Sequence, residues 1–338
     1  MVMKILRLLF ATLALALLNP SFAATTASAE YKKASGPFAV ETVRYDWQDT
    51  KRDRKVPVKI YFPKEVGPFP VIVFSHGLGG SREGYEYLGR HWASYGYVSV
   101  HVQHIGSDNA VWQGVPLGEV MQRMKQAALN LENAANRPKD ISFAIDQLEK
   151  MNQQEGILKG QLDLKRIGVA GHSFGAFTTL AIAGQKFGGP QGNISFTDPR
   201  VKAVIAMSAP VTPIQARTEG AFDAIKIPCF HMTGTRDASP IGETQPEDRR
   251  IPFDRCHNSD QFLVIFKDGD HMIFSGRGRM RGAEKDALFQ QYIRMSSLAF
   301  WDGFLKDEAR GRNWLVGAGF QTVLGADGTL EKKLAKLK

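Results

Sequence analysis

Short apolar runs recur along this chain at intervals that suit alternating strands and helices. The first two runs, at 40–47 and 56–62, are joined by a charged turn and predict an antiparallel pair of strands. Continuous apolar runs, which are typical of strands buried on both faces, follow at 71–74, 97–102, 166–170, 201–207, 227–232 and 262–266. Segments with helical periodicity lie at 85–94, 117–131, 137–151, 174–183 and 284–304. This alternation predicts an α/β fold whose mostly parallel sheet is covered by helices on both faces.

The first 23 residues have the pattern of a secretory signal peptide. Lys4 and Arg7 begin it, an apolar run fills 5–18, Pro20 ends the run and 21–23 supplies small residues for cleavage. The alternative is an uncleaved anchor, but a run of about 14 residues is shorter than the roughly 20 that span a bilayer. We therefore expect an exported protein, periplasmic or secreted, without a stable membrane anchor.

The rest of the chain is expected to form one domain, because the strand signals run through it without a break. Residues 24–36 are small and polar and predict a flexible leader, and 37–338 is then a single domain. A long stretch at 106–136 separates two predicted elements and is expected to form a small inserted cap.

The segment 171–175, Gly-His-Ser-Phe-Gly, matches the G-x-S-x-G pattern and lies between a predicted strand and a predicted helix. So sharp a turn strains the backbone of the serine and leaves no room for side chains at the flanking glycines. The arrangement is typical of the nucleophile of the α/β-hydrolase fold. Ser173 is therefore the predicted nucleophile, and a glycine-rich turn with an idle serine is the weaker alternative.

A serine hydroxyl needs a base and a group that orients the base, and in this fold the chain order is serine, acid, histidine. Asp237 follows the predicted strand 227–232, and His271 follows the predicted strand 262–266. Both then emerge at the carboxyl ends of neighbouring strands, where ligands bind in open α/β sheets. The sequence predicts a triad of Ser173, Asp237 and His271.

Other acids and histidines compete for these roles. Asp268 and Asp270 are close to His271 in sequence, but a neighbouring side chain on an extended loop points away. His231 lies within a predicted strand, and His257 precedes its strand at the wrong end of the sheet.

The loop at 75–80, Ser-His-Gly-Leu-Gly-Gly, directly follows a predicted strand. The fold places one oxyanion donor in this loop and the other on the residue after the nucleophile, which nominates the backbone N–H groups of Leu78 and Phe174. A phosphate-binding glycine loop is the alternative. It lacks the Lys-Ser/Thr ending of a P-loop, and Arg82 stands where a dinucleotide motif has its third glycine.

No cofactor, metal or nucleic acid is indicated. The sequence has neither C-x-x-C nor H-E-x-x-H, and His101 and His104 have no obvious third ligand. The net charge of +9, which falls to +7 without Lys4 and Arg7, is spread thinly and shows no basic stripe interleaved with aromatic residues.

Two cysteines in an exported chain favour a disulfide. Cys229 and Cys256 each lie near the beginning of a predicted strand, towards the same end of the sheet. A disulfide and two separate thiols, one of them buried, are equally compatible with this placement.

The segments 74–80 and 171–175 together resemble the platelet-activating-factor acetylhydrolases and the bacterial dienelactone-hydrolase-like esterases. They are more distantly similar to the cutinase-like polyester hydrolases. The resemblance covers about 56–274 and implies a carboxylic ester substrate, a serine nucleophile and no cofactor.

Two departures limit that resemblance. The acetylhydrolases carry their acid after the strand that follows the nucleophile helix, where this chain has Ser208 and no carboxylate, so Asp237 takes the role as in the other two groups. Dienelactone hydrolases proper use a cysteine where this chain has Ser173.

The sequence predicts a serine esterase that acts through an acyl-enzyme on short-acyl esters, either small molecules or lipid-like. A lipase, a polyester hydrolase and a peptidase can use the same triad, and a non-catalytic binding protein on this scaffold is the least favoured alternative. The candidate residues for lining the substrate pocket are His104, Trp112 and Met272, with Val115, Met121 and Met124 as further cap residues.

Overall fold

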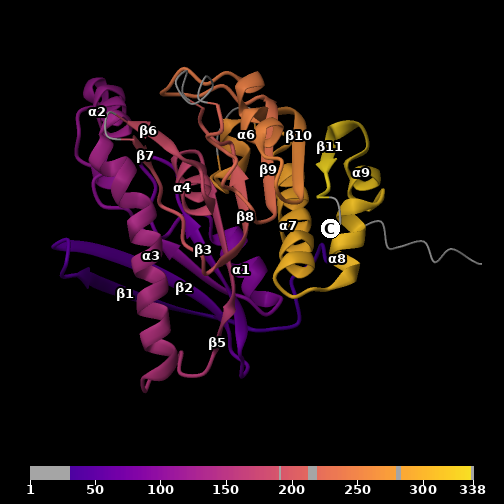
Figure 1. Cartoon of the computed structure of the whole chain (residues 1–338), viewed down its shortest axis with the longest axis horizontal. Helices are drawn as coiled ribbons and strands as arrows, with labels where there is room; N and C mark the ends of the chain where they lie inside the picture. The colour runs from indigo at the N-terminus through magenta and orange to yellow at the C-terminus, as the bar shows by residue number, and fades with distance from the viewer. Residues whose placement is uncertain (1–30, 190–191, 212–218, 279–282, 336–338) are drawn as a thin grey trace, which may run out of the picture.

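A computed structural model describes residues 31–189, 192–211, 219–278 and 283–335, so the expected signal peptide lies outside it (Figure 1). Within these residues, nine strands form one sheet in the order β1-β2-β4-β3-β5-β8-β9-β10-β11. The strands are β1 Val40–Asp49, β2 Arg54–Pro63, β3 Phe69–Ser75, β4 Val98–Val102, β5 Leu162–His172, β8 Val201–Met207, β9 Cys229–Arg236, β10 Gln261–Asp270 and β11 Gly328–Lys333. The pairs from β4 through β10 are parallel, and β1, β2 and β11 add antiparallel strands at the two edges.

The sheet is buried on both faces, as the continuous apolar runs predict. In β3, Ile72 and Phe74 belong to one hydrophobic cluster, with residues of α1 and α7, and Val71 and Val73 belong to the other, with residues of α3 and α4. The main helices are α1 Glu86–Ser94, α2 Leu117–Leu129, α3 Leu131–Gln153, α4 Phe174–Ala183, α6 Ile251–Arg255, α7 Asp286–Phe304, α8 Ala309–Val316 and α9 Gly319–Leu324. The predicted α/β-hydrolase architecture is confirmed.

The segment expected to form a cap contains a short turn, η1 Asn109–Val111, the whole of α2 and the beginning of α3. Figure 1 shows α2 at one end of the long helix α3. The two helices are separated only by Asn130, whose side chain accepts a hydrogen bond from the backbone N–H of Asn133 (3.0 Å). α3 starts six residues before the predicted helix 137–151, and Pro138 lies within it.

The sequence pattern predicts α7 as the last helix, but further elements follow it. α8 and α9 follow, and β11 pairs with β10 in antiparallel register from Gln261↔Lys333 to Phe266↔Gly328. Its polar sequence, Gly-Thr-Leu-Glu-Lys-Lys, has no clear alternation of apolar and polar residues, so the strand leaves little signal. A short hairpin of β6 Phe187–Gly189 and β7 Gly192–Ile194 is also absent from the sequence prediction.

The flexible leader expected at 24–36 does not extend to Tyr31, which is buried and packs its ring 5.4 Å from that of Trp314. Its hydroxyl donates to Asp302 Oδ2 (2.7 Å), and the ammonium group of Lys32 lies 2.6 Å from the same oxygen. A buried carboxylate therefore fixes this segment. Over the described ranges, no helix is long and apolar enough to cross a bilayer.

Candidate active site

Ser173 occupies a strained turn between β5 and α4. Its backbone has φ 57° and ψ −119°, and its N–H donates to Met207 O (2.9 Å). A Cβ atom on Gly171 would lie 2.2 Å from Gly175 O, and one on Gly175 would lie 1.9 Å from Ser75 O. The glycines of the motif are therefore required, because the turn touches itself and the end of β3.

Replacing Gly175 with alanine should destabilise the protein by about 1–3 kcal/mol, because the new methyl group would displace backbone that has no room to yield. Gly118 provides the control. It lies inside α2, and nothing comes within 4 Å of the place that an added methyl group would take, so Gly118→Ala should stabilise slightly, by up to about 1 kcal/mol. Urea unfolding of both variants measures this difference. Equal midpoints for Gly175→Ala and the unaltered protein would contradict the tight approach to Ser75.

In the predicted triad, His271 lies within hydrogen-bonding distance of both Ser173 and Asp237. His271 Nε2 is 3.0 Å from Ser173 Oγ, and His271 Nδ1 is 2.8 Å from Asp237 Oδ1. Asp237 directly follows β9 and is fully buried, and His271 directly follows β10 and is 9% exposed. Because β9 and β10 are parallel neighbours, the two side chains reach the same edge of the sheet.

Three residues that the sequence pattern does not identify hold the acid. Ser208 Oγ donates to Asp237 Oδ1 (2.8 Å) and lies 2.8 Å from His271 Nδ1, and Thr233 Oγ1 donates to Asp237 Oδ2 (2.9 Å). The guanidinium of Arg249 donates to the carbonyl oxygens of Asp237 (3.0 Å) and Ser208 (2.9 Å). Burial lowers the pKa of Arg249, and the neighbouring Asp237 opposes that shift. The carboxylate is therefore fixed by the hydroxyl groups of Ser208, directly after β8, and Thr233, within β9.

The competing acids and histidines make other contacts. Asp268 pairs with Arg236 (2.8 Å), and Asp270 accepts a hydrogen bond from the backbone N–H of Met272 (2.9 Å). His231 is buried in β9 against Gln261 (3.0 Å), and burial lowers its pKa to about 4.

The loop at 75–80 lies beside the turn that carries Ser173. Phe174 is the first residue of α4, so its N–H has no acceptor within the helix and lies at the positive end of the helix dipole. Gly79, with φ +70°, follows Leu78 and donates its N–H to Ser107 O (2.9 Å). The two nominated oxyanion donors therefore belong to two segments that meet at Ser173.

The segment expected to form the cap contacts this loop directly. The indole N–H of Trp112 donates to Gly79 O (2.7 Å), and a Cβ atom on Gly79 would lie 3.0 Å from both Trp112 Cδ1 and Met124 Cε. Met272, beside the histidine, is 38% exposed. His104 is fully buried against Ser75 and Asp140, so the expectation that it lines the pocket is wrong.

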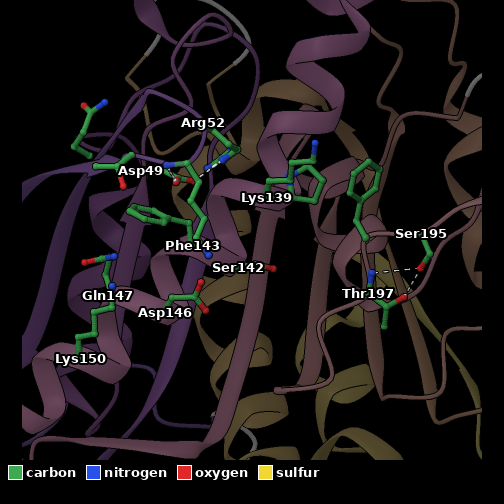
Figure 2. A pocket seen from close by; sticks show the side chains of 15 residues that line it. Asp49, Arg52, Lys139, Ser142, Phe143, Asp146, Gln147, Lys150, Ser195 and Thr197 are labelled. Carbon is green, nitrogen blue, oxygen red and sulfur yellow. Dashed lines mark hydrogen bonds and ion pairs between the residues drawn. The ribbon is translucent and has the colours of Figure 1, made fainter.

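A surface pocket of about 470 Å³ lies elsewhere, between the β1–β2 turn, α3 and the 195–197 segment. Figure 2 shows its lining, which includes Arg52, Lys139 and Thr197 and none of the triad residues. The candidate active site is therefore defined by its reactive groups and not by this pocket.

Both cysteines are free thiols, and both are buried. Cys229 and Cys256 pack in the same hydrophobic cluster, and burial raises the pKa of each thiol. The structure therefore has the second alternative, two separate thiols, and both of them are buried. Across the described residues, no group of three His, Cys, Asp or Glu side chains is placed to hold a metal ion.

Comparison with known proteins agrees with the observed fold. The Chlorophyllase family model matches residues 29–216. A platelet-activating factor acetylhydrolase from Cavia porcellus is 31% identical over 290 residues, which is 77% of this chain and 63% of that protein. The enzyme of the same name from Canis lupus familiaris is 26% identical over 198 residues (51% and 41%), and Cutinase 2 from Thermobifida cellulosilytica is 23% identical over 127 residues (38% and 39%).

The chain spans less than two thirds of the length of these relatives. The predicted resemblance to acetylhydrolases and cutinases is nevertheless confirmed. Because the family model covers more than half of the sequence and the sheet has the expected order and direction of strands, this chain belongs to the chlorophyllase family of α/β-hydrolases.

Proposed function

We propose that this protein is a serine carboxylic-ester hydrolase that acts through an acyl-enzyme. The observation that carries the proposal is the hydrogen-bonded series Ser173 Oγ, His271 Nε2 and Nδ1, and Asp237 Oδ1. A serine on a strained strand-to-helix turn, with a histidine and a buried acid behind it, is the arrangement that activates a hydroxyl for acyl transfer. The names of the relatives, acetylhydrolase and cutinase, support the same class of reaction.

In the proposed reaction, His271 Nε2 takes the proton of Ser173 Oγ as that oxygen attacks the ester carbonyl carbon. The carbonyl oxygen becomes an oxyanion that accepts hydrogen bonds from the N–H groups of Leu78 and Phe174. The alcohol leaves with the proton from His271. Water then attacks the acyl carbon with His271 again as base, and the carboxylic acid leaves as Ser173 Oγ takes a proton back from His271. Asp237 holds the imidazole in the required tautomer and stabilises its cationic form. Water is the only co-reactant.

Export is part of this proposal. The signal-peptide pattern of the first 23 residues supports a periplasmic or secreted enzyme. Detection of a mature N-terminus at residue 24 in an extracellular or periplasmic fraction tests it.

We expect short acyl groups to be preferred. Trp112 and Met124 lie against the oxyanion loop at Gly79, so an acyl chain bound there has little room to extend under the cap. With nitrophenyl esters, kcat/KM for dodecanoyl should be about tenfold or more below the values for acetyl and butyryl, a difference of ~1.4 kcal/mol. A higher value for dodecanoyl would move the enzyme towards lipases, and cleavage of a peptide anilide at a comparable rate would favour a peptidase.

A pair of variants separates the cap's role from other causes of this preference. Trp112→Ala should raise the dodecanoyl value relative to acetyl, because it removes the ring that covers Gly79. Leu117→Ala, at a position of α2 that is 91% exposed, should leave the ratio unchanged.

A further inference from the structure

Arg137 is a fully buried cation in the second turn of α3. Its Nε donates to Thr178 Oγ1 (3.1 Å), its Nη1 donates to Ser107 Oγ (2.8 Å), and its Nη2 donates to Ser75 Oγ (3.3 Å) and to the carbonyl oxygen of His76. Burial lowers the pKa of Arg137 to about 9, and the nearby Asp140 opposes that shift. The guanidinium is therefore charged at neutral pH and donates hydrogen bonds to four residues.

These partners lie on both sides of the candidate oxyanion hole. Ser75 and His76 begin the loop that carries Leu78. On the other side, the guanidinium carbon lies 4.5 Å from the ring centre of Phe174, and Thr178 Oγ1 donates to Phe174 O (3.0 Å). One guanidinium thus contacts the segments of both backbone donors.

A second series of hydrogen-bonded polar groups contacts the loop 75–80 through Ser75. His104 Nε2 lies 2.9 Å from Ser75 Oγ, and His104 Nδ1 lies 3.0 Å from Asp140 Oδ2. Arg54 Nε and Arg52 Nη1 approach Asp140 Oδ1 to 2.9 Å and 2.8 Å. The series has the residue types of a catalytic triad, but Ser75, His104 and Asp140 are all fully buried. It therefore orients the Ser75 hydroxyl and offers no attacking group to a substrate.

Stability alone gives little reason for such an arrangement. A buried ionic network can often be replaced by apolar residues of similar volume without loss of stability, because removing charges from water is costly. A planar guanidinium with several fixed donors does, however, hold backbone and hydroxyl groups in a defined geometry. Such a fixed geometry matters in an active site, because a shift of about 1 Å there can lower the reaction rate on the order of 100-fold.

We propose that Arg137 is a positioning residue that holds the N–H groups of Leu78 and Phe174 at the spacing required to bind one oxyanion. This inference rests on the proposed esterase function. Arg137 does not touch the substrate in this view. It acts through the loop 75–80 on one side and the first turn of α4 on the other.

The test compares an acetyl oxoester with its thionoester analogue, in which a larger and more weakly accepting sulfur enters the oxyanion hole. The intact enzyme should favour the oxoester strongly, because its donors are placed for oxygen. In Arg137→Met, kcat for the oxoester should fall on the order of 100-fold with little change in KM. The thionoester rate should fall far less, so the ratio of the two rates approaches one. Arg137→Lys keeps the charge but not the planar donors and should be intermediate.

Arg200→Met is the matched control. Arg200 also binds several groups, including Asp146 and Glu149 of α3, but these residues lie more than about two helical turns along α3 from Arg137. The variant should change neither rate by more than about twofold, since distant sites without shared partners act independently. Circular dichroism and urea unfolding of each variant show that the folded protein is being assayed.

An unchanged rate ratio in folded Arg137→Met would overturn the inference. If that variant fails to fold, Thr178→Val tests the same inference through the same rate ratio. It removes the hydroxyl between Arg137 and Phe174 O and should lower the ratio about tenfold if the geometry acts through this contact. An unchanged ratio there would equally overturn it. An intact enzyme that hydrolyses neither ester would instead remove the proposed function, and the inference with it.

Discussion

Ser173→Ala should abolish ester hydrolysis while leaving the protein folded. The hydroxyl is the protein group that forms a covalent bond to the acyl carbon in the proposed mechanism, and loss of such a serine costs on the order of 10⁶-fold in kcat. The backbone at this position has φ 57°, a strain that alanine shares with serine, so stability should change little. The measurement is kcat for nitrophenyl acetate, together with the urea unfolding midpoint.

Ser195→Ala is the control for this prediction. Ser195 is exposed and bonds only to Thr197 within the described contacts of its side chain, so the variant should keep full activity. A fluorophosphonate probe should label the unaltered enzyme and Ser195→Ala at Ser173, and it should not label Ser173→Ala. Retention of more than a few per cent of the turnover in Ser173→Ala would remove this residue as the nucleophile.

Asp237→Asn should lower kcat on the order of 10,000-fold, by analogy with the corresponding change in other triads. The asparagine keeps the size of the side chain and can retain bonds to Ser208 and Thr233. It cannot stabilise the cationic imidazole, and its amide group favours the wrong tautomer of His271. The loss should therefore appear in kcat, with KM nearly unchanged.

Asp270→Asn provides a matched comparison one residue from the same histidine. Asp270 caps the short helical turn η3 His271–Phe274 by accepting a hydrogen bond from Met272, and asparagine caps such turns equally well. Its kcat should stay within about tenfold of the starting value, since the carboxylate at His271 Nδ1 is that of Asp237. If Asp270→Asn were the more damaging change, the acid would have to be reassigned.

Much of this site could be predicted because its residues directly follow strands. Ser173, Asp237 and His271 each stand just after a continuous apolar run. Parallel strands deliver their carboxyl ends to one edge of the sheet, so the order of elements along the chain is enough to bring the three together. The catalytic roles remain predictions that the variants above test.

The residues that hold the triad and the loop could not be predicted in this way. Arg137 and Arg249 look like surface arginines in the sequence, and their burial depends on partners far along the chain, such as Thr178 and Ser208. The prediction that His104 lines the pocket is wrong for the same reason. A histidine just after a strand can point into the pocket or away from it, and here contacts with Ser75 and with Asp140 on α3 hold the ring away from the pocket.

The carboxylate of Asp302 has a consequence for how the molecule unfolds. It accepts hydrogen bonds from Tyr31, near the start of the described chain, and from Tyr97, at 2.7 Å each, while itself standing near the end of α7. Detaching either the N-terminal segment that carries Tyr31 or α7 would expose the buried carboxylate of Asp302 or leave tyrosine hydroxyl groups without their acceptor. The N-terminal segment and α7 should therefore open together as one cooperative unit, with similar protection of their amides against hydrogen exchange.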